Sequence, residues 1–232
     1  LVIQGNEKVI SARFSDASYF VKADSQRKFH EFRQDLSRLT FQDQLGSMLD
    51  KSQRIEQLAV ELAEFFGLDN NQIATVKKAA HLSKADLATQ MVVEMTELQG
   101  VIGREYALDS GESKQVAEAI EQHYWPLRIN GDLPESIPGV IVGLADRLDS
   151  LVGLLSIGLK PTGDTDPFGQ RKMALGCVQL LLGKTLDIDL RIALEMAAQA
   201  QPVRTEAVVE QAASFILNRL QVVLRDRDYR HD

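Results

Sequence analysis

The short motif that stands out first is Gly183-Lys184-Thr185, which matches the end of a phosphate-binding loop. Such a loop needs four residues between its two glycines, so that successive backbone N–H groups surround one phosphate. Here six residues separate Gly183 from the preceding glycine, Gly176, and this intervening sequence is leucine-rich and helical in character. The motif therefore predicts a helix that ends in glycine with a lysine beside it, and not a nucleotide site.

Few other residues have the types and spacing that catalysis needs. The chain contains neither a Gly-x-Ser-x-Gly elbow nor a His-Glu-x-x-His pair. Its one cysteine, Cys177, lies in the apolar run 174–178 with no histidine near it in sequence, which predicts a buried thiol. We interpret His81 as a core or capping histidine, with metal ligation as the alternative.

Helical spacing of apolar residues dominates the elements that would position these groups. One stripe predicts an amphipathic helix that stops at Gly67: Ile55, Leu58, Ala59, Leu62 and Phe66. The next helix is predicted to begin near Asp69, whose side chain can cap it. Further helices are predicted over residues 112–124, 137–157, 167–182, 187–199 and 204–224.

The first ten residues have a different pattern. Apolar pairs at Val2-Ile3 and Val9-Ile10 flank Gly5-Asn6, which predicts a short β-hairpin around a two-residue turn. No other strand pattern follows it. We therefore expect an all-α protein with a short N-terminal hairpin or extended segment, in which residues 1–25 are the end of an upstream module.

Composition narrows the class of protein further. The 232 residues include 26 Lys and Arg against 33 Asp and Glu, a net charge of −7 that excludes a surface basic throughout but allows a local basic face. Hydrophobic residues at 44% and charged residues at 25% are typical of a globular protein. One cysteine fits a reducing compartment, so we expect a cytoplasmic location. The start lacks both an initiator Met and a signal-peptide pattern, and we interpret the chain as a fragment of a longer protein.

Several positions resemble the metal-binding frame of the HD superfamily of helical phosphohydrolases. That family uses a His that opens one helix, a His-Asp doublet that ends another, and a distant Asp within an Ala-Asp pair. Lys51 stands where the first His would be, and Ser83 and Lys84 stand in place of the doublet. Asp146 matches the last ligand, and residues 120–124 resemble the family's downstream His segment.

These substitutions predict that the metal site is lost. A carboxylate with lysine in place of its co-ligands cannot hold two divalent cations, because the like charge repels them. We expect an ion pair between Lys84 and Asp146 instead. The resemblance thus implies an HD-type helical domain with a degenerate metal site over residues 26–160, followed by a helical connector over residues 161–232.

A second resemblance covers nearly the whole chain. Seven stretches carry it, all in the same order as in the family: residues 11–20 (SARFSDASYF), 41–46 (FQDQLG), 82–92 (LSKADLATQMV), 97–103 (ELQGVIG), 145–149 (ADRLD), 158–163 (GLKPTG) and 166–168 (DPF). Together they resemble the β subunits of bacterial tetrameric (α2β2) glycyl-tRNA synthetases. Small departures, such as Val101 where the family commonly has Met, change nothing decisive.

This resemblance implies a division of labour. In the family, the α subunit binds glycine and ATP and makes the adenylate, while the β subunit contributes tRNA binding near the acceptor arm and through a C-terminal anticodon-binding domain. The chain would cover the HD-type domain and the start of the anticodon-binding region, with no catalytic residue, metal or cofactor of its own. Its expected partners are glycine tRNA and the α subunit, with no membrane or DNA.

Contacts with RNA need Lys and Arg for phosphates, and aromatic or Arg planes for exposed bases. The candidates in the pocket of the lost metal, in loops or at the start of a later helix are Lys84, Arg104, Arg128, Arg147, Lys160, Arg171 and Lys172. Each of them taken alone also fits an ordinary surface residue. Trp125 fits either a base-stacking side chain or a core residue at a helix end.

Three functions therefore remain open. The chain is a non-catalytic tRNA-binding module of a glycine–tRNA ligase, a purely structural docking domain of the same synthetase, or a metal-dependent HD phosphohydrolase. Ser83 and Lys84 argue against the third, because neither supplies the required metal ligand. The first two functions both require an exposed polar face. Clustering of Lys and Arg on one surface would distinguish them, because it would favour tRNA binding.

Overall fold

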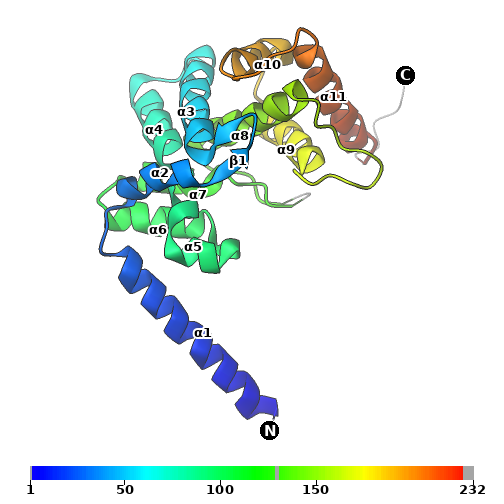
Figure 1. Ribbon diagram of the computed structural model, residues 1–232. Coiled ribbons are helices and arrows are strands. Elements are labelled where there is room, and N and C mark those ends of the chain that lie inside the picture. The colour runs from blue at the N-terminus through cyan, green and yellow to red at the C-terminus, as the bar shows by residue number, and fades with distance from the viewer. Residues whose placement is uncertain (1, 129–130, 227–232) are drawn as a thin grey trace.

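The computed structural model describes residues 2–128 and 131–226, and these are mostly helical (Figure 1). The α-helices are α1 (Val2–Asp24), α2 (Phe32–Asp35), α3 (Met48–Phe65), α4 (Asn70–Leu82), α5 (Gln90–Glu94), α6 (Val101–Asp109), α7 (Lys114–Gln122), α8 (Ile137–Ser156), α9 (Gln170–Gly183), α10 (Leu190–Gln199) and α11 (Val208–Asp226). Short 3₁₀ turns lie at Phe29–Glu31, Leu36–Arg38, Ala85–Ala88 and Thr96–Leu98. The strands β1 (Thr40–Gln42) and β2 (Gly46–Ser47) pair antiparallel.

Local sequence signals set the helix ends. Ser47 caps α3 in a reciprocal box with Asp50, and Asp69 caps α4 in the same way with Gln72, as its side chain predicted. After α3 the chain turns at Gly67 with a φ of +67°, a value that costs glycine little. The helices predicted from Ile55 onward are confirmed, with ends shifted by a few residues.

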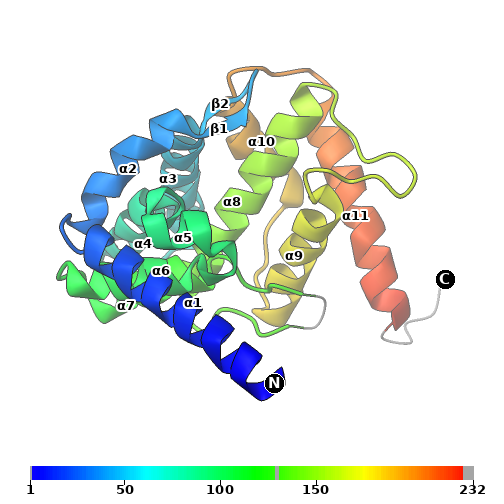
Figure 2. The ribbon, with the colours of Figure 1, turned by 60° about the horizontal axis from the view of Figure 1, so that its bottom comes forward.

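Helix α8 is the centre of the fold. It contacts α3, α4, α7, α9, α10 and α11, and Figure 2 shows it between α3 on one side and α9 and α11 on the other. Leu144, Leu148 and Leu151 on this helix are almost completely buried. A helix that is apolar on nearly every side is typical of the middle of a core, and α8 therefore fixes the position of every group that projects from it.

The N-terminal hairpin was a wrong prediction, because residues 2–24 form one long helix. Two apolar pairs around Gly5-Asn6 are too short a pattern to separate the two structures, whereas Ile10, Phe14, Ala17 and Val21 continue at spacings of three and four. Figure 1 shows α1 extending away from the rest of the molecule. The small sheet lies instead at residues 40–47.

None of the described helices combines the length and the apolar character that a crossing of the lipid bilayer requires.

Asp24 fastens the end of α1 to the body. Its buried carboxylate accepts hydrogen bonds from the backbone N–H groups of Gln90 (2.9 Å) and Met91 (3.0 Å), at the start of α5. It also accepts one from the hydroxyl of Tyr106 at 3.1 Å. Burial, together with the negative charge of Asp24, raises the pKa of the Tyr106 phenol, so this hydroxyl stays a donor at every pH of interest.

We predict that Asp24→Ala lowers the free energy of unfolding by about 2–4 kcal/mol, because it leaves two buried N–H groups and one hydroxyl without an acceptor. Asp16→Ala is the matched control, since Asp16 is an exposed carboxylate on the same helix. Urea denaturation measures both variants. Equal effects of the two substitutions would contradict the anchoring role of Asp24.

Candidate functional site

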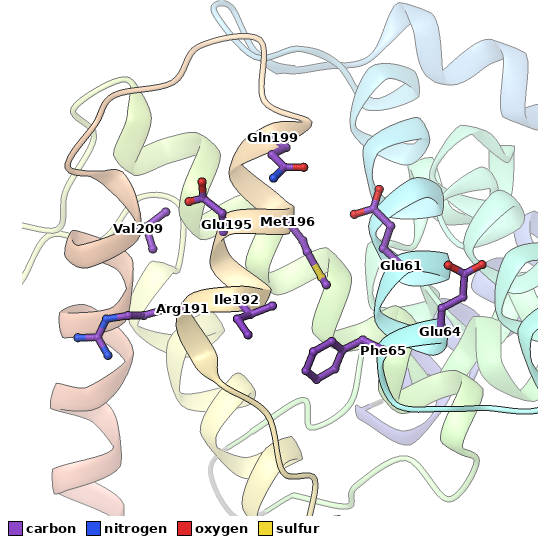
Figure 3. Close-up of a pocket in the computed structure, with 9 residues that line it drawn as sticks. All are labelled: Glu61, Glu64, Phe65, Arg191, Ile192, Glu195, Met196, Gln199 and Val209. Atoms are coloured by element: carbon purple, nitrogen blue, oxygen red, sulfur yellow. The ribbon is translucent and has the colours of Figure 1, made fainter.

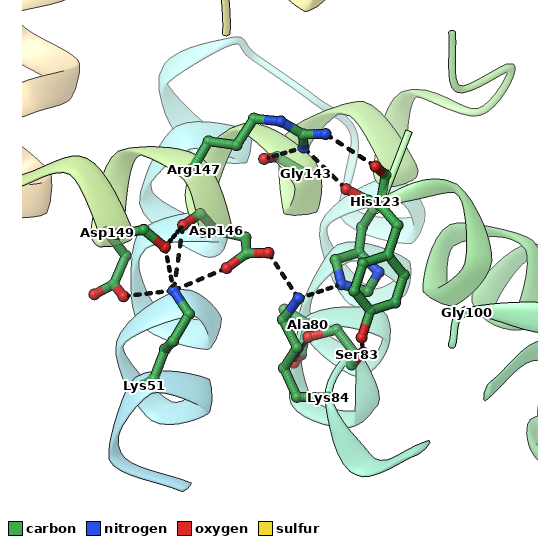
Figure 4. A network of polar contacts seen from close by, with 12 residues as sticks. Lys51, Ala80, Ser83, Lys84, Gly100, His123, Gly143, Asp146, Arg147 and Asp149 are labelled. Atoms are coloured by element: carbon green, nitrogen blue, oxygen red, sulfur yellow. Dashed lines mark hydrogen bonds and ion pairs between the residues drawn. The ribbon is translucent and has the colours of Figure 1, made fainter. Parts of the chain in front are cut away.

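The polar centre of the molecule is a buried cluster around Asp146 of α8 (Figure 4). Lys51 of α3 contacts one carboxylate oxygen, with Nζ 2.8 Å from Oδ1, and Lys84, just after α4, contacts the other, with Nζ 2.7 Å from Oδ2. The two lysine side chains are each 5% exposed. The predicted pair of Lys84 and Asp146 is therefore confirmed, and Lys51 makes it a bridge of two ammonium groups.

A second carboxylate supports Lys51 from behind. Asp149, one turn further along α8, lies 2.9 Å from Lys51 Nζ and 2.7 Å from Arg54 Nε. Ser150 accepts a hydrogen bond of 2.6 Å from the same ammonium. The amide of Gln201 donates to Asp149 at 2.8 Å, which brings the segment after α10 into the cluster. The second carboxylate balances the positive charge that Lys51 carries into the core.

His123 completes the cluster on the side of Lys84. Its Nδ1 lies 2.5 Å from the carbonyl oxygen of Ile120 and donates to it, so Nε2 carries a lone pair and accepts from the Lys84 ammonium at 2.9 Å. The ammonium also lies 4.1 Å from the centre of the Tyr124 ring. These contacts require a neutral imidazole.

The pKa values follow from this arrangement. Burial alone would raise the pKa of Asp146, but the ammonium groups of Lys51 and Lys84 outweigh it and hold the pKa well below its usual range. For Lys51, burial opposes the charge, yet Asp146 and Asp149 together raise its pKa. Burial lowers the pKa of Lys84, and Lys51 adds repulsion. Burial and the charge of Lys84 lower the pKa of His123 well below its ordinary value.

This chemistry suits ion pairing better than metal binding. Both oxygens of Asp146 already face ammonium groups, and a divalent cation there would meet two positive charges. Ser83, the other residue at the doublet position, donates its hydroxyl to the carbonyl oxygen of Ala80. Within residues 2–128 and 131–226, no three His, Cys, Asp or Glu side chains are arranged to hold a metal ion. The cluster's contribution is to the stability and shape of the bundle.

The side chain of Arg147 serves the fold in a similar way. Its Nη1 donates to the carbonyl oxygens of His123 (3.0 Å) and Gly143 (2.8 Å), and its Nη2 donates to those of Tyr124 (3.1 Å) and Trp125 (2.8 Å). Arg147 is 8% exposed and Lys84 is 4% exposed. Neither side chain is placed to contact RNA, because both are buried and donate to other groups of the chain itself.

The other candidate cations lie at the surface in different settings. Arg104 makes ion pairs with Glu105 and Glu121, which neutralise much of its charge. Lys160 is exposed and lines a pocket next to Glu210. The remaining three, Arg128, Arg171 and Lys172, lie together around one pocket.

Two residues with open interpretations also have a place. Trp125 is half-buried and lines a pocket with Tyr124, so the structure leaves part of its ring accessible. His81 contacts Glu56 with its Nδ1 at 2.8 Å, in a surface pair. Cys177 is buried as predicted, and burial raises its pKa to about 12, which makes it a poor nucleophile.

A larger pocket of about 770 Å³ lies between α3 and α10 (Figure 3). Phe65, Ile192 and Met196 give it an apolar floor, and Glu61 and Glu64 of α3 also line it, with Glu61 pointing toward α10 in Figure 3. Arg191 also lines it, but this guanidinium makes an ion pair with Glu210. The net negative rim disfavours a phosphate ligand.

The sequence interpretation missed half of the buried cluster. Asp149 and Ser150 lie three and four residues after Asp146, so one helical face carries all three, and Arg54 lies three residues after Lys51. This spacing was visible in the sequence. No local signal predicted that Gln201 reaches the same carboxylate.

The fold and the site thus define a mostly helical domain whose polar centre holds ion pairs. A family model described as glycyl-tRNA synthetase beta subunit matches residues 1–232 of the chain. The chain therefore belongs to the glycyl-tRNA synthetase beta subunit family.

Curated relatives agree with this family. The chain is 41% identical over 227 residues to a glycine–tRNA ligase beta subunit from Ectopseudomonas mendocina, a match that covers 97% of this chain and 33% of that protein. It is 41% identical over 230 residues to the beta subunit from Gloeothece citriformis, covering 97% and 32%. It is 40% identical over 228 residues to the chloroplastic/mitochondrial glycine–tRNA ligase 2 of Arabidopsis thaliana, covering 97% and 21%. The chain spans about a third of the length of the bacterial relatives.

We predict that Asp146→Ala lowers the free energy of unfolding by about 3–5 kcal/mol, because two ammonium groups lose a shared buried partner. Lys84→Ala should cost less, since Asp146 then keeps Lys51. Asp164→Ala, at an exposed loop position, is the control. Chemical denaturation of the variants gives the ranking, and an Asp146→Ala effect below about 1 kcal/mol would refute the bridge.

His123 predicts a dependence of stability on pH. The pKa of His123 is depressed in the folded state. Below about pH 6.5 the unfolded chain therefore binds a proton that the folded chain does not bind, and the free energy of unfolding decreases as the pH is lowered. The loss is up to about 1.4 kcal/mol per pH unit for one such group. Wild type should therefore lose stability between pH 6.5 and pH 5 relative to His123→Gln.

The measurement is urea denaturation of both proteins at pH 7, 6 and 5, with His30→Gln as the control because His30 is an exposed histidine. The readout is how the difference in free energy of unfolding between variant and wild type changes with pH. A substitution that only destabilises the protein in general gives the same difference at every pH. Parallel curves for wild type and His123→Gln would show that His123 accepts a proton in the folded state.

Proposed function

We propose that this chain is part of the β subunit of a glycine–tRNA ligase and binds glycine tRNA on the acceptor-arm side. The ATP-dependent attachment of glycine would be carried out by a separate α subunit in an α2β2 assembly. The observation that carries this proposal is the match of the family model to residues 1–232. The proposal includes a cytoplasmic location, and it includes that this chain alone has no aminoacylation activity.

We also propose that the buried cluster is an HD-type site in which lysine has replaced the metal. In support, Lys51 of α3, Lys84 after α4 and Asp146 of α8 converge on one point, although they are far apart in sequence. His123 reaches the same point from the end of α7. On this proposal residues 26–160 are the HD-like unit, and residues 161–232 connect it to an anticodon-binding region.

A docking domain is the second candidate, and helix α1 is the observation that favours it. Val9, Ile10, Phe14 and Tyr19 on this helix are between 55% and 73% exposed. Apolar side chains displayed in this way are typical of surfaces that bind other protein segments. Docking through α1 and RNA binding elsewhere are compatible. The third candidate, a metal-dependent phosphohydrolase, lacks support because ammonium groups face both oxygens of Asp146.

We predict that the chain binds glycine tRNA and a minihelix of its acceptor arm with a similar affinity. Binding to each should weaken by about ten-fold or more between 50 and 200 mM salt, because several phosphate contacts release counterions. Fluorescence anisotropy across a salt series measures both. No binding to either RNA at 50 mM salt would refute RNA binding by this chain and leave docking as its function.

A further inference from the structure

We propose that a pocket between residues 126–128, the start of α9 and the end of α11 binds the phosphate groups of RNA. This inference rests on the proposed function and assigns a place to it. The pocket has a volume of about 430 Å³, within the range of sites for small ligands and single nucleotides. The side chains that give it its character are Arg128, Arg171, Lys172 and Arg219.

Charge is the first argument. Four basic residues from three separate segments converge on the pocket, and no acidic side chain is among the described residues that line it. The chain as a whole carries a net charge of −7, so this gathering of one sign is local. Convergent positive charge in a concave site raises the local concentration of anions. The pocket of Figure 3, with Glu61, Glu64 and Glu195, has the opposite character.

The availability of the cations is the second argument. Arg128 and Lys172 are exposed, and neither makes an ion pair within the described structure. Arg171 donates to the carbonyl oxygen of Gly163, which orients its guanidinium without neutralising it. Arg219 has a buried Nε with no hydrogen-bond partner in the described part of the chain. No ion pair with Arg219 is found in the described part of the chain, so its guanidinium adds an unneutralised positive charge to the pocket lining.

The apolar surface between the cations is the third argument. Pro126, Leu127, Leu175 and Val222 line the same pocket, and Leu127 and Val222 are 56% and 41% exposed. Phosphates bind the cations, whereas sugars and bases need flat apolar or aromatic surface beside them. A site for a simple inorganic anion has no use for such a floor.

The neighbouring pocket extends the argument from one phosphate to a strand of RNA. It shares Leu127 and Arg128 with the basic pocket and is lined by Tyr124 and Trp125. Glu97, Glu121 and Asp132 line its remainder, so this second pocket suits an uncharged base and not a phosphate. A nucleotide chain lying across Leu127 would place a phosphate beside Arg128 and a base against the accessible side of Trp125. An acidic peptide matches the cations equally well, and the test below distinguishes it from RNA by its binding of polyglutamate.

The structure also holds this surface in a defined position. Arg147 donates to the carbonyl oxygens of Tyr124 and Trp125, directly before the segment that lines both pockets. Gly176 on α9 leaves room for that guanidinium, because a Cβ at this position would collide with Arg147 Nε. Residues that are fixed before binding lose less entropy when they bind.

The test is the affinity of the chain for the acceptor minihelix at several salt concentrations. A phosphate contact contributes about 5- to 8-fold to affinity at 100 mM salt and about 0.7–0.9 to the slope of log K against log salt. We expect Arg128→Ala to weaken binding by about that factor. Lys172→Glu, which reverses a charge, should weaken it by about ten-fold or more and lower the slope by about one.

Lys77→Glu is the matched control, since Lys77 is also an exposed lysine of a helix without an ion pair, on α4 and away from α9 and α11 (Figure 1). It should leave both the affinity and the slope unchanged. Circular dichroism and thermal unfolding check that all variants fold. Their positions at the surface give no reason for a loss of stability.

The outcomes separate the pocket from the proposed function. Normal RNA binding by Arg128→Ala and Lys172→Glu would overturn the pocket while leaving RNA binding by the chain intact. Absence of RNA binding by wild type at 50 mM salt would overturn both. Polyglutamate that binds as tightly as the minihelix, and loses affinity in the same variants, would overturn the assignment to RNA and indicate an acidic protein partner.

Discussion

The structure depends on the sharing of one carboxylate by two buried ammonium groups. Lys51 arrives from α3 and Lys84 from the end of α4, and Asp146 on α8 is the point at which both meet. Removing three charges from water is expensive, and the cost is offset only while every partner is present. The cluster therefore determines the relative positions of α3, α4 and α8 as well as contributing to the stability of their packing. Asp149 and His123 extend the same specification to Arg54 and to the end of α7.

The buried cluster and the basic pocket are connected through Arg147. Arg147 lies next to Asp146 on α8. Its guanidinium donates to the carbonyl oxygens of residues 123–125 and so fixes this main-chain segment to the core. The segment that follows lines the surface where RNA is proposed to bind. The cluster itself consists of ion pairs that are enclosed by the chain, and the surface proposed to bind RNA lies outside it.

The sequence predicted the helices, the Asp69 cap and the stop at Gly67, because these depend on residues close together in the chain. It also predicted the pair of Lys84 and Asp146, since a resemblance supplied the contact that spacing does not. Arg147 shows the limit. A lone arginine after an aspartate is a typical surface residue, and only the three-dimensional packing of α8 against residues 123–125 makes it a buried donor. The α1 error had the opposite cause, because a short local pattern fitted two structures.

Helix α1 is, in mechanical terms, a lever. Its 23 residues at about 1.5 Å per residue make a rod of about 35 Å, and its buried hydrogen bonds lie at one end, at Asp24. A tilt of about ten degrees at that end moves the other by about 6 Å, by simple geometry on the same length. The same tilt at the contact of Asp24 with α5 would move Phe14 by about 3 Å and Val9 by about 4 Å. A partner bound to these side chains would be displaced together with them.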